Sequence, residues 1–211
     1  MVTRGFSRAS LGLAAAICVF GSVCVSAQGQ QRKDAEPTSP AARSFHDAKY
    51  GVRLQVPAGW NFTQKDGELS TFHLDARSAG RKAQLRAVAA LAFNPYPAST
   101  FSGALFYFSV QPQTSEVECA TEASGKTTPK EARVNGVIFA HGHDEHGTIC
   151  VEARDEVYTT RRAGSCYRFD LVMNSFCGGE VSGSEDMAQT QMDEIRKRME
   201  SILNTIRIDA K

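Results

Sequence analysis

Residues 137–173, VIFAHGHDEHGTICVEARDEVYTTRRAGSCYRFDLVM, decide the fold, because they read as three consecutive strands separated by two turns. The turns are expected near HDEHG, at residues 143–147, and near RRAG, at residues 161–164. Strands joined by such short connections pair antiparallel, so the segment predicts an antiparallel sheet. The last strand alternates, and its buried face is expected to carry Tyr167, Phe169, Leu171 and Met173.

The residues before this segment supply further strands. VRLQV, at residues 52–56, alternates between apolar and polar side chains, and FSGALFYFSV, at residues 101–110, is apolar on both faces, which predicts a central strand. Phe72 and Leu74 suggest another short strand. QLRAVAALAF, at residues 84–93, fits a helix by its alanines and a strand by its alternation, and we favour the strand.

Two helices are expected. SEVECATEA, at residues 115–123, is a short helical candidate, and Ser184 is expected to cap a longer helix that runs toward TIRI at residues 205–208, a possible closing strand. The longer helix has one apolar stripe, formed by Ala188, Met192, Ile195, Met199, Ile202 and Ile206. The fold class is therefore expected to be α+β, an antiparallel β-sheet with helices packed on its faces and a long C-terminal amphipathic helix.

The N-terminus predicts export. Within residues 1–27, Arg4 and Arg8 precede an uncharged stretch that ends in Val25-Ser26-Ala27, the small-residue pattern of a signal-peptidase site. The apolar stretch is shorter than the ~20 residues that a spanning helix needs, so no transmembrane segment is expected. We expect a periplasmic or secreted protein, cleaved near Ala27.

Composition sets the organisation of the rest of the chain. Residues 28–43 lack large apolar side chains and predict a flexible linker, and residues 44–211 predict a single domain. Loss of the signal peptide removes two of the 24 basic side chains and none of the 23 acidic ones, so the formal charge moves from +1 to 22 − 23 = −1. A nucleic-acid partner is excluded because no basic stripe is present.

The mature chain keeps four cysteines in a compartment that oxidises thiols, because Cys18 and Cys24 leave with the signal peptide. Two disulfides are expected, and spacing alone leaves all three pairings open. A zinc site is disfavoured because no pair has CxxC spacing. The disulfide candidates are Cys119, Cys150, Cys166 and Cys177.

Both ends of the domain resemble PsbP-like domains. The opening has the aromatic residue, turn, short strand and Pro-x-Gly-Trp of that family, in Phe45, Asp47, Gly51, Val52 and VPAGW at residues 56–60. The close, an amphipathic helix that runs into ILNTIRI at residues 202–208, is also similar. The resemblance implies an antiparallel sheet with helices on its faces. Known members include a photosystem II subunit, a Ran-binding protein and exported bacterial proteins, so it also implies docking on a partner without catalysis.

HGHDEHG, at residues 141–147, is the candidate metal site. Residues two apart on a strand project to one side, so His141 and His143 could hold zinc or copper, with His146 or Glu145 as third ligand. Alternatively, residues 137, 139 and 141 pair with residues 149, 151 and 153. His141 then ends a buried row, and residues 143–146 form a solvated hairpin tip.

The sequence contains no complete set of catalytic residues that we recognise. AGSCY, at residues 163–167, resembles the cysteine-protease nucleophile segment, but no histidine follows Cys166 to activate a thiolate. CGGEVSGSED, at residues 177–186, lacks the lysine of a phosphate-binding loop. An enzyme that uses two carboxylates would need them buried and facing in a cleft. The sequence therefore predicts no catalytic residues and no cofactor, in an exported binding or assembly module with a protein partner. The alternative is a zinc- or copper-binding exported protein.

Overall fold

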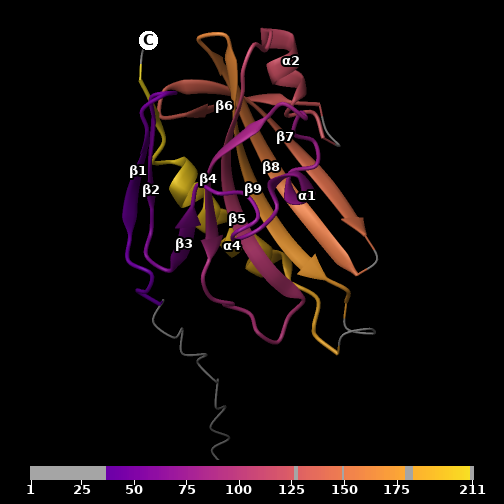
Figure 1. Ribbon diagram of the computed structural model, residues 1–211. Coiled ribbons are helices and arrows are strands. Elements are labelled where there is room, and N and C mark those ends of the chain that lie inside the picture. The colour runs from indigo at the N-terminus through magenta and orange to yellow at the C-terminus, as the bar shows by residue number, and fades with distance from the viewer. Residues whose placement is uncertain (1–36, 126–127, 149, 179–182, 210–211) are drawn as a thin grey trace, which may run out of the picture. The chain divides into compact units, whose positions relative to one another are not determined.

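The computed structural model describes residues 37–125, 128–148, 150–178 and 183–209. The expected signal peptide and most of the expected linker lie outside these residues. The elements follow in this order (Figure 1): β1 (Arg43–Asp47), β2 (Val52–Val56), β3 (Trp60–Thr63), α1 (Phe72–Asp75), β4 (Gln84–Leu91), β5 (Phe101–Gln111), α2 (Glu116–Thr121), β6 (Lys130–Val134), β7 (Val137–Thr148), β8 (Val151–Arg162), β9 (Ser165–Phe176), α4 (Gln189–Leu203) and β10 (Arg207–Ile208).

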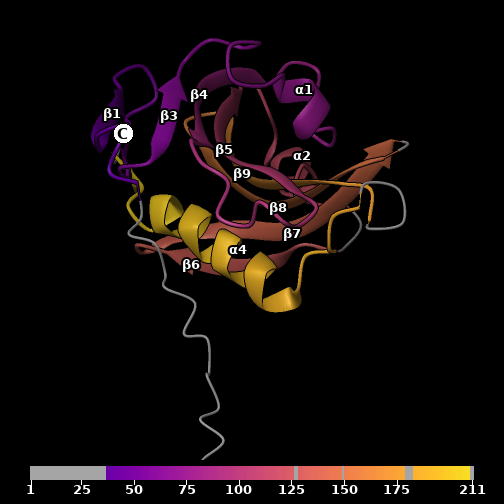
Figure 2. The same cartoon turned by 90° about the horizontal axis from the view of Figure 1, so that it is seen from below.

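Seven strands form the large sheet in the order β3-β4-β5-β9-β8-β7-β6, and every neighbouring pair is antiparallel. A second sheet has the order β1-β2-β10. The antiparallel α+β prediction is confirmed in this outline. β5 lies between β4 and β9, as expected of its apolar sequence. Figure 2 shows α4 along one side of the large sheet and α1 on the other.

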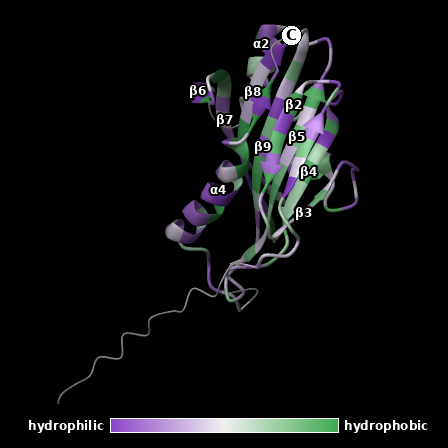
Figure 3. Ribbon diagram, turned by 90° about the vertical axis from the view of Figure 1, so that its left-hand side faces the viewer, coloured by the Kyte–Doolittle hydropathy of each residue, from purple (hydrophilic) through white to green (hydrophobic). Residues whose placement is uncertain are grey.

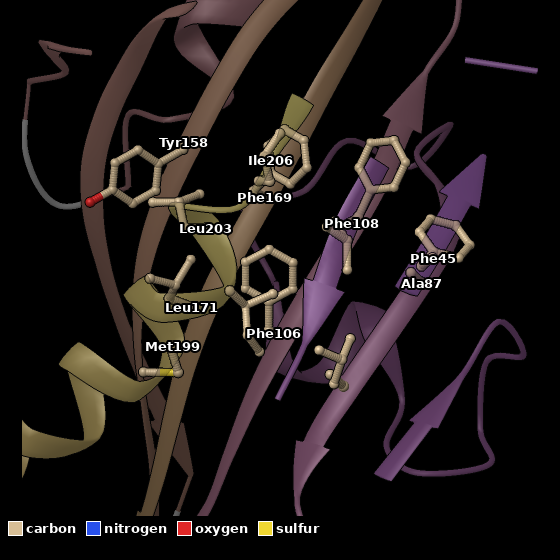
Figure 4. Close-up of a cluster of buried hydrophobic side chains, with 14 of the residues drawn as sticks. Phe45, Ala87, Phe106, Phe108, Tyr158, Phe169, Leu171, Met199, Leu203 and Ile206 are labelled. Atoms are coloured by element: carbon tan, nitrogen blue, oxygen red, sulfur yellow. The ribbon is translucent and has the colours of Figure 1, made fainter. Parts of the chain in front are cut away.

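The two faces of the large sheet differ in chemistry because alternate residues of β9 point in opposite directions. On the α4 face, Phe108 and Phe169 stack with ring centroids 4.9 Å apart, and Met199 of α4 joins the same cluster (Figure 4). Buried Ile195 of α4 also belongs to it. Figure 3 shows the polar residues that α4 carries beside its apolar ones. On the α1 face, a smaller cluster around Phe72 shares the interior with buried charges.

The turn expected at HDEHG is wrong. β7 continues through these residues to Thr148, and His141 pairs with Tyr158, so the expected pairing of residues 137–141 with residues 149–153 is wrong as well. Polar residues remain in the strand because β8 pairs with it from Ala140 to Thr148, through the whole HDEHG stretch. The RRAG turn is confirmed: Ala163 and Gly164 have φ of 46° and 76°, as a tight hairpin turn requires.

Two further predicted elements are confirmed, and one is wrong. Residues 84–91 form a strand, and α2 begins with a capping box in which Ser115 Oγ accepts from the Glu118 N–H. Phe72 and Leu74 do not form a strand but lie in α1, a single helical turn that buries Phe72 against the sheet.

The C-terminal helix is shorter than expected. Ser184 does not cap it, because the neighbouring Glu185 is held in an extended bridge, accepting from the Thr100 N–H at 2.8 Å and donating to the Ala98 carbonyl at 3.0 Å. α4 begins only at Gln189, and the buried part of its stripe starts at Ile195. In the TIRI segment, Arg207–Ile208 pairs with β2. In the described part of the chain, no helix is long and apolar enough to cross a membrane.

Candidate functional site

The β7 strand separates the three histidines of HGHDEHG. His141 and His143 lie opposite Tyr158 and Glu156 of β8, on the α4 face. His146 lies opposite Ala153, whose side chain packs on the α1 face. The structure therefore brings His141 and His143 together and places His146 on the other side of the sheet. Glu145, the alternative third ligand, lies with its Oε1 3.4 Å from His143 Nε2.

His141 and His143 both approach the carboxylate of Glu156. His141 Nε2 is 2.8 Å from Glu156 Oε2, and His143 Nδ1 is 3.4 Å from Oε1. Arg196 of α4 also reaches Oε1, at 3.5 Å, and the His141 ring stacks on Tyr158 at 4.2 Å. Burial alone would raise the pKa of Glu156, but the His141 hydrogen bond and the nearby positive charges lower it. The cluster joins the hairpin to α4 through Glu156.

His146 serves a different contact. Its Nε2 is 3.0 Å from the Leu74 carbonyl oxygen of α1, and its Nδ1 is 3.9 Å from Asp144 Oδ2. Both partners lie on the α1 face, so the ring joins β7 to α1. Within the described ranges, no group of three or more His, Cys, Asp or Glu residues is arranged to hold a metal ion.

We expect the mature, non-reduced chain to show a metal-free mass with two disulfides in native mass spectrometry. The reason is that His146 points to the opposite face of the sheet, while His141 and His143 are directed at the Glu156 carboxylate, which also forms an ion pair with Arg196. The control is the His141→Gln/His143→Gln/His146→Gln variant. A zinc or copper ion present in the wild type and absent from this variant would contradict the expectation.

The four cysteines form two disulfides, as the sequence predicts. Cys119–Cys166 is buried and joins α2 to β9, whereas Cys150–Cys177 joins the β7–β8 turn to the residue after β9 and leaves Cys150 exposed. Spacing left three pairings open, and the structure has the one that joins Cys119 to Cys166 and Cys150 to Cys177.

Charged side chains are buried on the α1 face of β8 and β9. Asp155 and Asp170 are 0% exposed and Arg168 is 2% exposed. Arg168 donates to Asp170 Oδ1 from Nη2 at 2.6 Å and from Nε at 2.8 Å, and its Nη2 lies 3.7 Å from Asp155 Oδ2. Its Nη1 donates to the Glu122 carbonyl oxygen at the end of α2, at 2.7 Å. We call Asp155, Arg168, Asp170 and Glu122 the buried charge cluster.

The buried charge cluster is not in a cleft. Its members line neither of the two surface hollows described below, and Asp155 and Asp170 have no exposed surface. Solvent and substrate therefore do not reach the carboxylates of Asp155 and Asp170. A two-carboxylate enzyme would need its pair in an accessible cleft, so these two residues do not form such a site. Sequence reasoning missed the cluster, although Arg168 and Asp170 are charged residues two apart within the apolar centre of β9 and could have indicated it.

A groove of about 510 Å³ lies between α2 and strands β6, β7 and β8. Its apolar lining includes Ile138, which is 47% exposed. Its charged lining has both signs, with Glu116, Lys130, Glu131 and Arg161. β6 is the last strand of the large sheet, so its outer edge has no strand partner among the described residues. We call this surface the α2–β6 groove.

A second hollow, of about 420 Å³, lies beside the Cys150–Cys177 disulfide. Its lining combines Met187 and Met192 with the charged residues Glu152, Arg154 and Asp186. Arg154 already forms ion pairs with Glu152 at 2.8 Å and with Glu145 at 3.4 Å. The charges of this hollow are thus partly neutralised within the chain.

No family model and no curated protein matches the chain. Among solved structures, one from Bacteroides thetaiotaomicron has a TM-score of 0.47 and 8% identity, over 84% of this chain and 50% of the other, so this chain spans about half its length. The PsbP protein of Synechocystis has a TM-score of 0.43 and 11% identity, over 80% of this chain and 92% of the other. The Ran-binding protein Mog1p of Saccharomyces cerevisiae has a TM-score of 0.41 and 10% identity, over 79% of this chain and 95% of the other. The similar structures thus include a PsbP protein, and the similarity concerns fold, not site residues.

Proposed function

We propose that the chain is an exported, non-catalytic module that binds a protein partner through the α2–β6 groove. The observation that carries the proposal is the groove itself, which joins an exposed aliphatic side chain, Ile138, to the outer edge of β6, where no strand pairs among the residues that the structure describes. Isolated exposed aliphatic residues are common on protein surfaces, but one that lies in a concave surface beside a free edge favours docking.

The chemistry of the groove suits a polypeptide. An apolar floor with charges of both signs around it resembles a protein–protein interface, where an apolar centre is surrounded by a polar rim. A partner segment in extended conformation would pair its backbone with β6 and place alternate side chains into the groove. The balanced charges give no preference for a polyanion, in agreement with the absence of a basic stripe in the sequence.

The titratable groups support a module without catalysis. The Asp155–Asp170 pair is sealed, and the His141 and His143 rings are engaged with Glu156. Each of these groups joins one element to another, and none of them lines the α2–β6 groove. The two disulfides support export, because such bonds persist in oxidising compartments.

The test is site-specific photo-crosslinking in the exporting host, with the crosslinker at position 138 or at position 151. Val151 is a matched control because it is also β-branched, lies on a strand and is 50% exposed, outside the groove. We expect one protein adduct from position 138 and none from position 151. The Ile138→Asp variant should weaken binding of the identified partner at least about tenfold, because it buries a charge in the interface.

Val151→Asp should leave that affinity unchanged. Adducts from both positions alike, or an Ile138→Asp variant that binds as the wild type does, would reject the α2–β6 groove as the binding surface. Circular dichroism of both variants checks that each is folded, which we expect because the two substituted side chains are exposed.

A further inference from the structure

Three oxygen atoms of the buried charge cluster have no hydrogen-bond partner among the described residues: both carboxylate oxygens of Asp155, and Oδ2 of Asp170. The two side chains nevertheless come from neighbouring strands and both approach Arg168 Nη2, and a hydrogen bond between them is among the causes that raise the pKa of Asp155. Two ionised carboxylates cannot bond to each other, because each has only acceptor atoms. A buried, unpartnered charged oxygen is energetically costly, so the cluster lacks a hydrogen-bond donor.

The charges around Asp155 come from every element packed against it. Asp170 and Arg168 lie on β9, and Asp144 faces Asp155 directly on β7, with His146 beyond it. At the C-cap of α2, the Glu122 carboxylate lies 3.4 Å from Arg168 Nη1. Other ionisable groups on this face are already engaged: Asp75 of α1 accepts from the Tyr107 hydroxyl of β5 at 2.5 Å. In the described part of the chain, Arg168 is the cation that both buried carboxylates contact.

We infer that Asp155 and Asp170 form a proton-binding site in which Asp155 is a neutral carboxylic acid that donates a hydrogen bond to Asp170 Oδ2. The proton comes from solvent on folding and returns to it on unfolding. Asp170 keeps its negative charge because Arg168 donates to its Oδ1 twice, whereas the closest approach of Arg168 to Asp155 is 3.7 Å. One added proton thereby satisfies two of the three unpartnered oxygens. It also leaves one negative charge on the aspartate pair, which the single positive charge of Arg168 balances.

The electrostatic environment agrees with this assignment. Burial raises the pKa of Asp155 well above its usual range, the charge of Asp170 raises it further, and Arg168 only partly opposes the two. In the unfolded chain, an aspartate loses its proton near pH 4. Between that pH and the raised value, the folded protein therefore holds a proton that the unfolded chain does not.

The sign of the pH dependence follows from this difference in bound protons. Stability from the shared proton is fully present below the unfolded pKa of about 4, and it is lost as the pH rises toward the folded pKa. One proton corresponds to a loss of up to about tenfold in the folding equilibrium constant per pH unit. Above the folded pKa, ionised Asp155 competes with Glu122 for Arg168, so the attachment of α2 is expected to weaken as well.

The test compares urea unfolding of the mature wild type and Asp155→Asn over a pH series from about 4 upward. Asparagine keeps the shape of the neutral acid and supplies an N–H donor to Asp170, but it does not titrate. We expect the ratio of the folding constant of Asp155→Asn to that of the wild type to rise up to about tenfold per pH unit. The control, Asp144→Asn, removes the facing carboxylate of β7 and should retain the pH-dependent stability.

A ratio that does not change with pH would overturn the inference. If Asp155→Asn fails to fold, infrared spectroscopy of the wild type decides: a carboxylic-acid carbonyl band that persists at neutral pH and shifts in heavy water is the expected result. Absence of that band from the folded wild type would show that both carboxylates are ionised, which is incompatible with a shared proton.

Discussion

Replacing Arg168 with methionine is expected to lower the free energy of unfolding by about 3–5 kcal/mol, because it leaves a carboxylate buried without its partner. Methionine fills a similar volume, so the loss comes from charge and hydrogen bonding more than from a cavity. Asp170 loses two donors, and the Glu122 carbonyl oxygen loses the donor that holds the end of α2. Urea unfolding at fixed pH measures the change.

The matched control is Arg154→Met, the same substitution on β8. Arg154 is 31% exposed and pairs with Glu152 and Glu145, which are more exposed still, so we expect a loss below about 1 kcal/mol. Adding Asp170→Asn to Arg168→Met should recover part of the lost stability, because it removes the stranded charge. Equal losses for the two single arginine variants would show that the buried pair is no more important than a surface pair.

The fold was predictable where one pattern decided one element. The alternation of β9 and the apolar sequence of β5 predict strands, and the helical spacing of the apolar residues from Ala188 to Ile202 predicts the helix that forms α4. The start of α4 was not predictable, because Glu185 is held by residues 98–100, a contact between segments far apart in the sequence. The position of the β7–β8 turn depended likewise on pairing that extends through polar residues.

The candidate sites were predictable only in part, for a related reason. His141 and His143 were expected to share a face, and they do, because their separation of two residues fixes this on any strand. Of the two expected third ligands, His146 required a turn between it and His143, and without that turn an odd separation puts it on the opposite face, whereas Glu145 stays on the face of His143 and pairs with it at 3.4 Å. The buried charge cluster draws on α2, β8 and β9, so no local spacing could have assembled it.

The second large loss of stability is expected from removal of the Cys119–Cys166 disulfide in the double variant Cys119→Ala/Cys166→Ala. Its sequence separation is 47 residues, against 27 for Cys150–Cys177. Loop entropy depends only logarithmically on length, so it predicts about 3–4 kcal/mol for either bond. The buried bond should nevertheless matter more, because its loss also leaves a void where two side chains are 2% and 1% exposed.

The double variant Cys150→Ala/Cys177→Ala is therefore the matched control, and the difference between the two isolates what the buried bond does locally. α2 has only six residues and depends on this disulfide and on the Arg168–Glu122 hydrogen bond for its place on the sheet. We expect faster amide hydrogen exchange across α2, and weaker partner binding at the α2–β6 groove, only when Cys119–Cys166 is removed. If α2 exchanged equally slowly in both variants, the disulfide would not be what positions this wall of the groove.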